Sequence, residues 1–166
     1  MNYNTPATGN KDEQYMYFGN YGVTVSNVKG GIDETSYIGG KWNTQKCLDA
    51  CTKENKDLTN GVTNVSGTGY CAPACCCVAY STPGTKSGDW YLPMPGELHQ
   101  IYENKTAINE KRTAIKGSGF SESQCYWSSR EGSSGSEYYV SLDGNISNCS
   151  KGYGNLYVLG FLALEV

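Results

Sequence analysis

After residue 120 the chain consists of short apolar segments separated by turns rich in Gly, Ser and Asn. The segments CYWSS, EYYVSL, NIS and LYVLGFLALEV have the length and composition of β-strands. The pair Asp143-Gly144 predicts a tight hairpin, because this dipeptide readily adopts the positive φ angles of such turns. Residues 156–166 are the most apolar, so we expect them to form a central strand. The pattern favours an antiparallel sheet.

A helix is predicted to begin at Pro95. Pro93 and Pro95 exclude a helix interior before that point, whereas proline suits the first turn of a helix. Glu97 then favours the positive end of the helix dipole. Leu98 and Ile101 are three residues apart and give the helix one apolar face.

Two further helices are predicted. One covers about residues 106–116 and ends at Gly117, a residue type that commonly terminates helices. The other covers about residues 44–55, where Asn43 or Thr44 is a suitable N-cap. Both helices are short and have narrow apolar stripes.

The remaining patterns complete an α+β fold. Residues 21–28 alternate apolar and polar side chains, as in a half-buried strand, and a short strand is expected at 35–38. The apolar run CCCVAYS, residues 75–81, predicts a strand buried on both faces. Residues 1–20 have no periodicity and are interpreted as an N-terminal arm or linker. The domain then spans residues 21–166, as a twisted antiparallel sheet with two or three short helices to one side.

Composition and charge exclude several classes of protein. Only 17% of the 166 residues are charged, and 13 Lys and Arg against 16 Asp and Glu give a net charge of −3. This excludes a long coiled coil and the basic surface of a nucleic-acid-binding protein. No apolar run reaches the roughly 20 residues of a membrane-spanning helix. The N-terminus lacks the pattern of a secretion signal, and 14 Tyr residues are unlike a disordered chain.

The eight cysteines leave three interpretations open. They are Cys47, Cys51, Cys71, Cys75, Cys76, Cys77, Cys125 and Cys149. An even number suits a disulfide framework, although three consecutive cysteines in an extended segment would alternate between faces and could not all reach one partner. Zinc could lie between a Cys47/Cys51 pair and a Cys71/Cys75 pair, but the tight CxxC motif is absent. The third and preferred interpretation is small buried hydrophobic residues, with at most one or two bridges.

Residues arranged for catalysis are not evident in the sequence. His99 is the single histidine and is interpreted as a surface or structural residue on the helix after Pro95. The acidic residues Asp89, Glu97, Glu131 and Asp143 are interpreted as solvated turn residues. Nucleophile, phosphate-binding and metalloprotease motifs are missing. We therefore expect no enzyme activity, no cofactor and no metal.

The C-terminal half resembles a known family. The segments GDWYLPMPGELHQIYENKTAIN (88–109) and YWSSREGSSGSEYYVSLDGNIS (126–147) are similar to the C-type-lectin-like domains of bacterial surface adhesins and phage fibres, including collagen-like adhesins and the variable proteins of diversity-generating retroelements. The matching positions are Trp90, Leu92, Pro93, Glu97, Leu98, Tyr126, Trp127, Ser128, Ser129 and Glu131. The resemblance covers about residues 85–166 and implies a C-type-lectin-like fold. Trp90, Trp127 and the turn from Pro93 are interpreted as packing residues.

The resemblance implies a binding function rather than an enzymatic one. Residues 130–157 are rich in Tyr, Ser, Gly and Asn, the mixture that antibody loops use. The expected exposed ligand-binding residues are Arg130, Ser133, Ser136, Tyr138, Asp143, Ser147, Lys151, Tyr153, Asn155 and Tyr157. Tyr138 and Tyr139 face opposite sides of a strand, so only one is expected to face the ligand. The EPN, QPD and WND signatures of calcium-dependent lectins are missing.

The sequence therefore predicts a receptor-binding or adhesion module. It is expected to recognise a cell-surface glycan or protein receptor, without nucleic-acid binding or membrane insertion. Its expected location is a phage virion, as a tail fibre or decoration protein, or a bacterial surface. A homo-oligomer is expected, and the trimer is the form common in fibres. The alternative is a structural virion or pilus subunit that uses the same face for subunit packing, and a third hypothesis is an enzyme or metal-dependent domain built on the cysteines.

Overall fold

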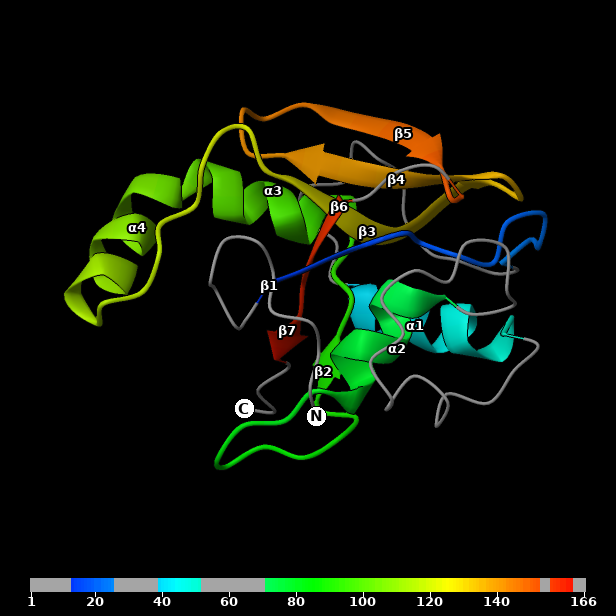
Figure 1. Ribbon diagram of the computed structural model, residues 1–166, viewed down its shortest axis with the longest axis horizontal. Helices are drawn as coiled ribbons and strands as arrows, with labels where there is room; N and C mark the ends of the chain where they lie inside the picture. Colours follow the sequence, from blue (N-terminus) through cyan, green and yellow to red (C-terminus); the bar gives the residue numbers. More distant parts are fainter. Residues whose placement is uncertain (1–12, 26–38, 52–70, 153–155, 163–166) are drawn as a thin grey trace.

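The computed structural model describes residues 13–25, 39–51, 71–152 and 156–162 (Figure 1). Within them the fold is α+β, with four helices and two sheets. The helices are α1 (Gly40–Asp49), α2 (Ala72–Ala79), α3 (Pro95–Glu103) and α4 (Lys105–Ala114). The strands are β1 (Glu13–Met16), β2 (Trp90–Tyr91), β3 (Cys125–Ser133), β4 (Ser136–Ser141), β5 (Ile146–Ser150), β6 (Leu156–Leu159) and β7 (Phe161–Leu162).

The larger sheet has the strand order β1-β6-β3-β4-β5, and β2 pairs with β7 in the smaller one. All pairs are antiparallel except β3 with β6, which run parallel. Asp143 and Gly144 form the tight turn between β4 and β5, and Gly144 has a φ of +97°. The hairpin predicted from this dipeptide is therefore confirmed. The central strand predicted at 156–166 is confirmed only in part: β6 covers Leu156–Leu159 and has neighbours on both sides, whereas β7 pairs with β2 in the smaller sheet. Residues 163–166 lie outside the described part of the chain.

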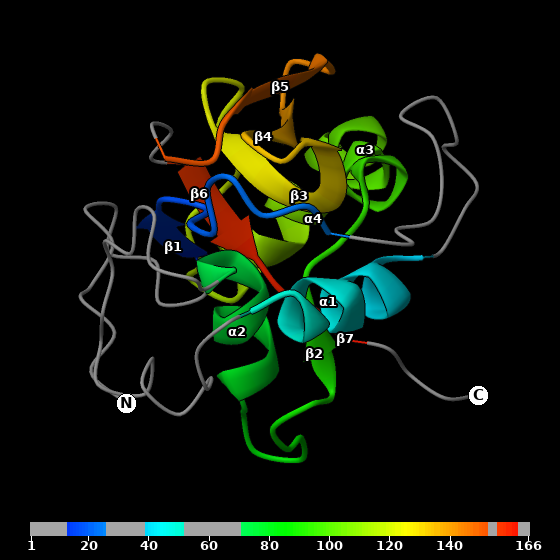
Figure 2. The same cartoon turned by 90° about the vertical axis from the view of Figure 1, so that its right-hand side faces the viewer.

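Both faces of the larger sheet are covered. Adjacent side chains of β3 belong to different hydrophobic cores, because neighbouring strand residues point to opposite faces. Trp127 packs with Phe18, Leu92, Val158 and the cysteines of α1 and α2 in core 1. Figure 2 shows α1 and α2 side by side beneath the sheet.

Core 2 lies on the opposite face of β3. Tyr126 packs there with Leu98 of α3, Phe120, Val140 and Leu142. Helices therefore lie on both faces of the sheet, and the prediction that they lie to one side is wrong. Four helices are present in the described part of the chain, where two or three were predicted.

Two strand predictions are wrong. The run from Cys75 to Ser81 lies mostly in α2, because Pro73 in its first turn starts a helix and small apolar residues pack equally well in either structure. Residues 21–25 form a turn and a loop, not the first part of a strand at 21–28. The strand predicted at 35–38 lies outside the described residues.

The N-terminal boundary also differs from the prediction. Residues 13–16 form β1, which pairs with β6, and Phe18 and Asn20 are fully buried. Residues 13–20 are therefore an integral part of the fold and not an arm, whereas residues 1–12 lie outside the described part. β1 was not predicted because the strand with which it pairs, β6, is far away in the sequence.

The helix predictions are confirmed with shifted limits. α3 begins at Pro95 as predicted, and α4 ends before Gly117. α1 begins at Gly40, so Asn43 and Thr44 lie inside the helix and not at its N-cap. Thr44 instead links α1 to the segment after β2, since its hydroxyl accepts a hydrogen bond from Leu92 N (2.8 Å). None of the described helices is long and apolar enough to span a bilayer.

Candidate functional site

The tip of the β3–β4 hairpin presents several small polar groups. The hydroxyls of Ser133 and Ser136 lie 2.8 Å apart across the turn, and Gly135 N donates to Ser133 Oγ (3.2 Å). A Cβ atom on Gly132 would lie 2.8 Å from Ser136 Oγ and 3.6 Å from Asn148 Cβ. Glycine is therefore needed here so that the serines and Asn148 of β5 can come together.

The loop of residues 19–25 is hydrogen-bonded to this tip. Gly22 N donates to Ser134 O (2.8 Å), and Gly19 N donates to Lys151 O (3.0 Å). Gly19, Asn20 and Gly22 all have positive φ angles, which let the loop turn sharply around Tyr21. The loop thus holds a tyrosine beside the hairpin by backbone hydrogen bonds.

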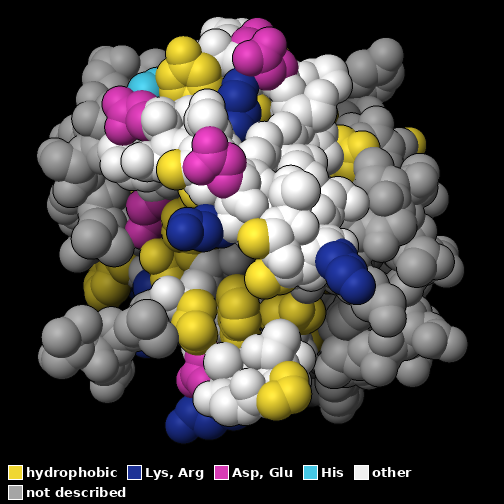
Figure 3. All heavy atoms as spheres, turned by 90° about the vertical axis from the view of Figure 1, so that its left-hand side faces the viewer, with side chains coloured by type: hydrophobic (Ala, Val, Ile, Leu, Met, Phe, Trp, Pro, Cys, Tyr) yellow, Lys and Arg dark blue, Asp and Glu magenta, His cyan; other side chains and the backbone are white. Residues whose placement is uncertain are grey.

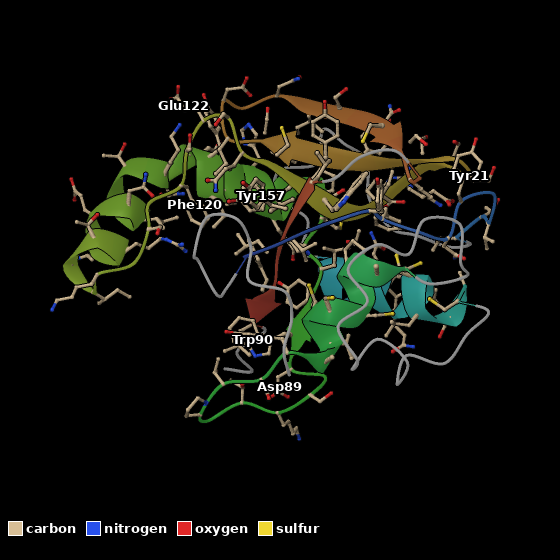
Figure 4. All side chains as sticks on the ribbon, in the orientation of Figure 1. Tyr21, Asp89, Trp90, Phe120, Glu122 and Tyr157 are labelled. Carbon is tan, nitrogen blue, oxygen red and sulfur yellow. The ribbon has the colours of Figure 1, made fainter. Side chains whose placement is uncertain are left out.

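Tyr21 is the most exposed aromatic side chain in the described part of the chain, with 58% of its surface accessible. Its ring lies against the hairpin turn, since a Cβ on Gly135 would lie 3.3 Å from Tyr21 Cε2. Figure 4 shows Tyr21 at the hairpin end of the molecule, far from Trp90. We call Tyr21, Ser133, Ser136, Tyr138 and Asn148 the hairpin-tip surface.

Strand register explains why Tyr138 belongs to this surface and Tyr139 does not. Tyr138 pairs with the exposed Asn148 across β4 and β5, so the two side chains share one face. Tyr139 points to the opposite face and packs against core 1, with Ser147 as its cross-strand partner. This agrees with the prediction that only one of the two tyrosines is presented outward.

A buried ion pair lies beneath the hairpin tip. The Lys151 side chain is fully buried, and its ammonium donates to Glu131 Oε1 (2.5 Å) and to Val23 O (3.1 Å). The single N–H of Val25 also donates to both carboxylate oxygens of Glu131 (2.9 and 3.0 Å). This ion pair fixes the loop of residues 19–25 to β3. Two predictions are therefore wrong: Lys151 is not part of an exposed face, and Glu131 is not a solvated turn residue.

Glu137 is a second buried carboxyl group next to this ion pair. It is fully buried, its Oε2 lies 3.9 Å from Lys151 Nζ, and neither oxygen has a hydrogen-bond partner. Burial raises the pKa of Glu137 well above its ordinary value, and Lys151 offsets only part of that rise. The group is therefore protonated in the folded protein at a pH where a solvated Glu is ionised.

The structure does not bring all the predicted binding residues together. Ser133, Ser136 and Tyr138 lie in the hairpin-tip surface, and Arg130 is half-buried in β3 with its Nε enclosed. Asp143 is exposed at the opposite end of β4, where it accepts hydrogen bonds from Ser141 Oγ and Asn145 N (3.0 Å for the latter).

Tyr157, on β6, is only half-exposed because its ring packs on Tyr126 of core 2, with 5.7 Å between ring centroids. Figure 4 places it beside Phe120, away from Tyr21. Tyr153 and Asn155 lie outside the described residues. The predicted set of ten therefore does not form one continuous exposed face.

Tyr21 was missed by the sequence analysis. The pattern Gly19-Asn20-Tyr21-Gly22 carries the relevant signal, because residues that tolerate positive φ on both sides of an aromatic residue predict a turn that presents the ring. Apolar alternation after Tyr21 favoured a strand instead.

The other side chains that could take part in catalysis or metal binding, such as Glu97 and His99, contact neighbouring groups of the fold. Glu97 is buried, in contrast to its predicted solvated position, and caps α3 by accepting from Met94 N (2.7 Å). His99 lies on α3, with its Nδ1 3.5 Å from Glu103 and its ring against Tyr102. Within the described ranges, no group of three or more His, Cys, Asp or Glu side chains is arranged to hold a metal ion. All eight cysteines are free thiols.

Charge is mixed over the molecular surface at the α4 end. Figure 3 shows basic and acidic side chains interspersed there, so neither sign forms an extended patch among the described residues on that face.

The chain was compared with family models, with curated proteins and with solved structures, and none of them matches.

Proposed function

We propose that the chain is a non-enzymatic binding module that recognises a glycan or protein receptor through the hairpin-tip surface. The observation that carries this proposal is the exposed ring of Tyr21, fixed over the β3–β4 turn by the backbone hydrogen bonds of its neighbours. A fixed aromatic ring offers contact area at a small entropic cost on binding. The hydroxyls of Ser133 and Ser136 at the same hairpin end, and the amide of Asn148, offer both donors and acceptors.

A C-type-lectin-like fold is part of the same proposal. The WYLPMPGEL segment supplies β2 and the start of α3, where Glu97 acts as the helix cap. The YWSS segment lies in the first half of β3, where the rings of Tyr126 and Trp127 are fully buried. Asp143 and Gly144 lie in the turn that connects β4 to β5. These placements support the packing roles that the resemblance implies. A module of this kind belongs on a virion or on a cell surface, as a homo-oligomer.

The test is a binding screen with paired variants. Purified protein is applied to a glycan array and to intact bacterial cells, and the bound ligand is then titrated with the wild type and with Tyr21→Ala. We expect Tyr21→Ala to weaken binding at least about tenfold, as truncation of a central aromatic contact commonly does. Ser133→Ala should weaken it less.

Trp42→Ala is the matched control. Trp42 is also an exposed aromatic residue (45% accessible), but it lies on α1 and is not part of the hairpin-tip surface. Equal binding by the wild type and Tyr21→Ala, or equal losses in Tyr21→Ala and Trp42→Ala, would contradict the assignment of this surface. If Tyr21→Ala instead abolishes self-association and no receptor is bound, the structural-subunit alternative replaces the proposal.

A further inference from the structure

Four cysteine side chains meet where the end of α1 approaches the start of α2. Cys47 and Cys51 are four residues apart, as are Cys71 and Cys75, so each pair extends from one side of its chain segment. All four belong to core 1 or pack against it. We call these residues the four-thiol cluster.

Within the cluster, Cys51 and Cys71 are in direct contact. Cys71 N donates a hydrogen bond to Cys51 Sγ at 3.1 Å. The side chains of Cys71 and Cys75 also interact with the Cys51 side chain. The Cys51 thiol donates to Cys47 O (3.2 Å). The Cys51 sulfur therefore lies against the backbone of Cys71, which is the N-cap residue of α2.

The four thiols differ in access to solvent. Cys47, Cys71 and Cys75 are buried, with 0 to 2% of their surface accessible, whereas Cys51 is only half-buried. A reagent from solution therefore reaches Cys51 first. The hydrogen bonds from Cys71 and Cys75 lower the pKa of Cys51, so its thiolate, the nucleophilic form, is stabilised. The side chains of Cys47 and then Cys51 raise the pKa of Cys71, and the Cys51 side chain and burial raise the pKa of Cys75.

Asn20 gives an independent indication that the Cys71 sulfur is held in a polar setting. This asparagine is fully buried in the loop below the hairpin tip. Its Nδ2 donates to Cys71 Sγ (3.5 Å) and to Ala50 O (3.3 Å). A buried thiol with a purely structural role needs only apolar neighbours. The contact with the Asn20 amide therefore indicates a cysteine that takes part in chemistry.

We propose that Cys51 and Cys71 form a disulfide bond by exchange with a low-molecular-weight disulfide, with Cys51 as the attacking residue. The Cys51 thiolate attacks one sulfur of the reagent, which breaks the reagent's S–S bond and releases one thiolate. Cys71 then loses its proton and attacks Cys51 Sγ, which displaces the second thiolate of the reagent. Two protein thiols are thereby oxidised to one disulfide, and one reagent disulfide is reduced to two thiols.

The bond would join the end of α1 directly to the start of α2. It closes the loop formed by the 19 residues between Cys51 and Cys71, and closing a loop of this length stabilises a folded protein by restricting its unfolded chain. We expect oxidation to raise the melting temperature by about 5 to 10 °C.

The experiment treats the whole chain with glutathione disulfide, blocks the remaining thiols with an alkylating agent and maps the linked peptides by mass spectrometry. The expected product is a Cys51–Cys71 link, with Cys125 and Cys149 still alkylated. Eight alkylated thiols after prolonged treatment, or a link between any other pair, would overturn the proposal.

Two variants and a rate measurement sharpen the test. Cys51→Ser should leave Cys71 unlinked, whereas Cys149→Ser, a half-buried thiol outside the cluster, should leave the Cys51–Cys71 link intact. Either opposite result counts against the proposal. If Cys51→Ser fails to fold by circular dichroism, the wild type still decides through the first step alone. The rate at which Cys51 forms its mixed disulfide with glutathione, followed by mass spectrometry after acid quenching, should change little between about pH 6 and about pH 8, and a rate of this step that rises about tenfold per unit would overturn the role of Cys51. Closure of the bond by Cys71, whose pKa is raised, should accelerate with pH.

Discussion

Gly40 shows how closely the chain packs around one buried carboxylate. A Cβ atom at this position would overlap the Glu97 carboxylate and lie 2.7 Å from the ring of Tyr91. Glu97 is held there by hydrogen bonds from Met94 N (2.7 Å) and from the Tyr91 hydroxyl (3.0 Å). Burial raises the pKa of Glu97, and these hydrogen bonds offset part of the rise. The glycine at the start of α1 is therefore required by the cap of α3.

We predict that Gly40→Ala lowers the free energy of unfolding by about 2 to 3 kcal/mol, because the added methyl group displaces two buried side chains. Urea denaturation measures this change. Gly160→Ala is the matched control, since its Cβ would lie at an ordinary 3.5 Å from Trp90 and should shift stability by less than about 1 kcal/mol. Similar losses in the two variants would be incompatible with the crowding at Gly40.

Glu137 should make stability depend on pH with a defined sign. Its pKa is raised in the folded state, so folding favours the protonated group. Its contribution is therefore fully present below the unfolded pKa of about 4.3 and is lost as the pH rises toward the folded pKa. In Glu137→Gln, which mimics the protonated form, this loss disappears. We predict that the variant gains about 1.4 kcal/mol over the wild type per pH unit above that value, until the pH reaches the folded pKa and the difference levels off.

Four neighbouring side chains also influence the pKa of Glu137. Lys151 and Arg130 lower its pKa, whereas Cys47 and Glu131 raise it. For this reason the measured quantity is the difference between wild type and variant, obtained from urea denaturation at pH steps between about 4 and 8. Glu122→Gln is the control: Glu122 pairs with Lys105 at the surface, where an ion pair contributes little to stability, so its difference should change much less with pH than that of Glu137→Gln. If the difference in unfolding free energy between the wild type and Glu137→Gln does not change with pH, the pKa of Glu137 is not raised in the folded protein.

Individual buried charges were not predictable from the sequence. Glu131 and Lys151 are 20 residues apart, and Glu131 binds a backbone amide 106 residues away. Their burial depends on how the loop of residues 19–25 folds over the hairpin. The sequence offers no local pattern for such a contact, whereas the position of Asp143 in a solvated turn follows from its own dipeptide.

At the scale of elements, local signals predicted the helices and hairpins that are encoded by their own residues. Pro95 and Glu97 define the start of α3, and Gly144 allows the β4–β5 turn. The segment from Ala72 to Ala79 was ambiguous, because eight small apolar residues suit a buried helix or a buried strand equally well. β1 was missed because its strand partner within the described residues, β6, lies 140 to 146 residues later.

The buried ion pair should control the loop that carries Tyr21. Lys151→Met removes the partner of the buried Glu131 and the contact to Val23 O, so we predict a loss of about 3 to 5 kcal/mol in unfolding free energy. Hydrogen exchange at the amides of Gly22 and Val25 should accelerate more than exchange in α3.

The control for this loop is Lys46→Met. Lys46 pairs with Asp49 on the exposed side of α1, so its loss should cost less than about 1 kcal/mol. A Lys151→Met protein with unchanged exchange at Gly22 would indicate that the backbone hydrogen bonds alone hold the loop.

For the whole molecule, the two cores share the central strand β3, which buries Tyr126 on one face and Trp127 on the other. The composition and the C-terminal hairpins were sufficient to predict an α+β fold. The two-sided coverage was not predictable, because it depends on α2 and on the return of β6 beside β3, both of which require contacts between distant segments.

This shared strand predicts that the two cores unfold together. Val158 (core 1) and Val140 (core 2) are both buried, and truncation of either to alanine should lower stability by about 2 kcal/mol. Because β3 couples the cores, each variant should speed hydrogen exchange equally in α2, which packs in core 1, and in α3, which packs in core 2. Ile115→Ala, at a 79% exposed side chain, should change neither. Faster exchange in α2 alone for Val158→Ala would show that the faces of the sheet unfold separately.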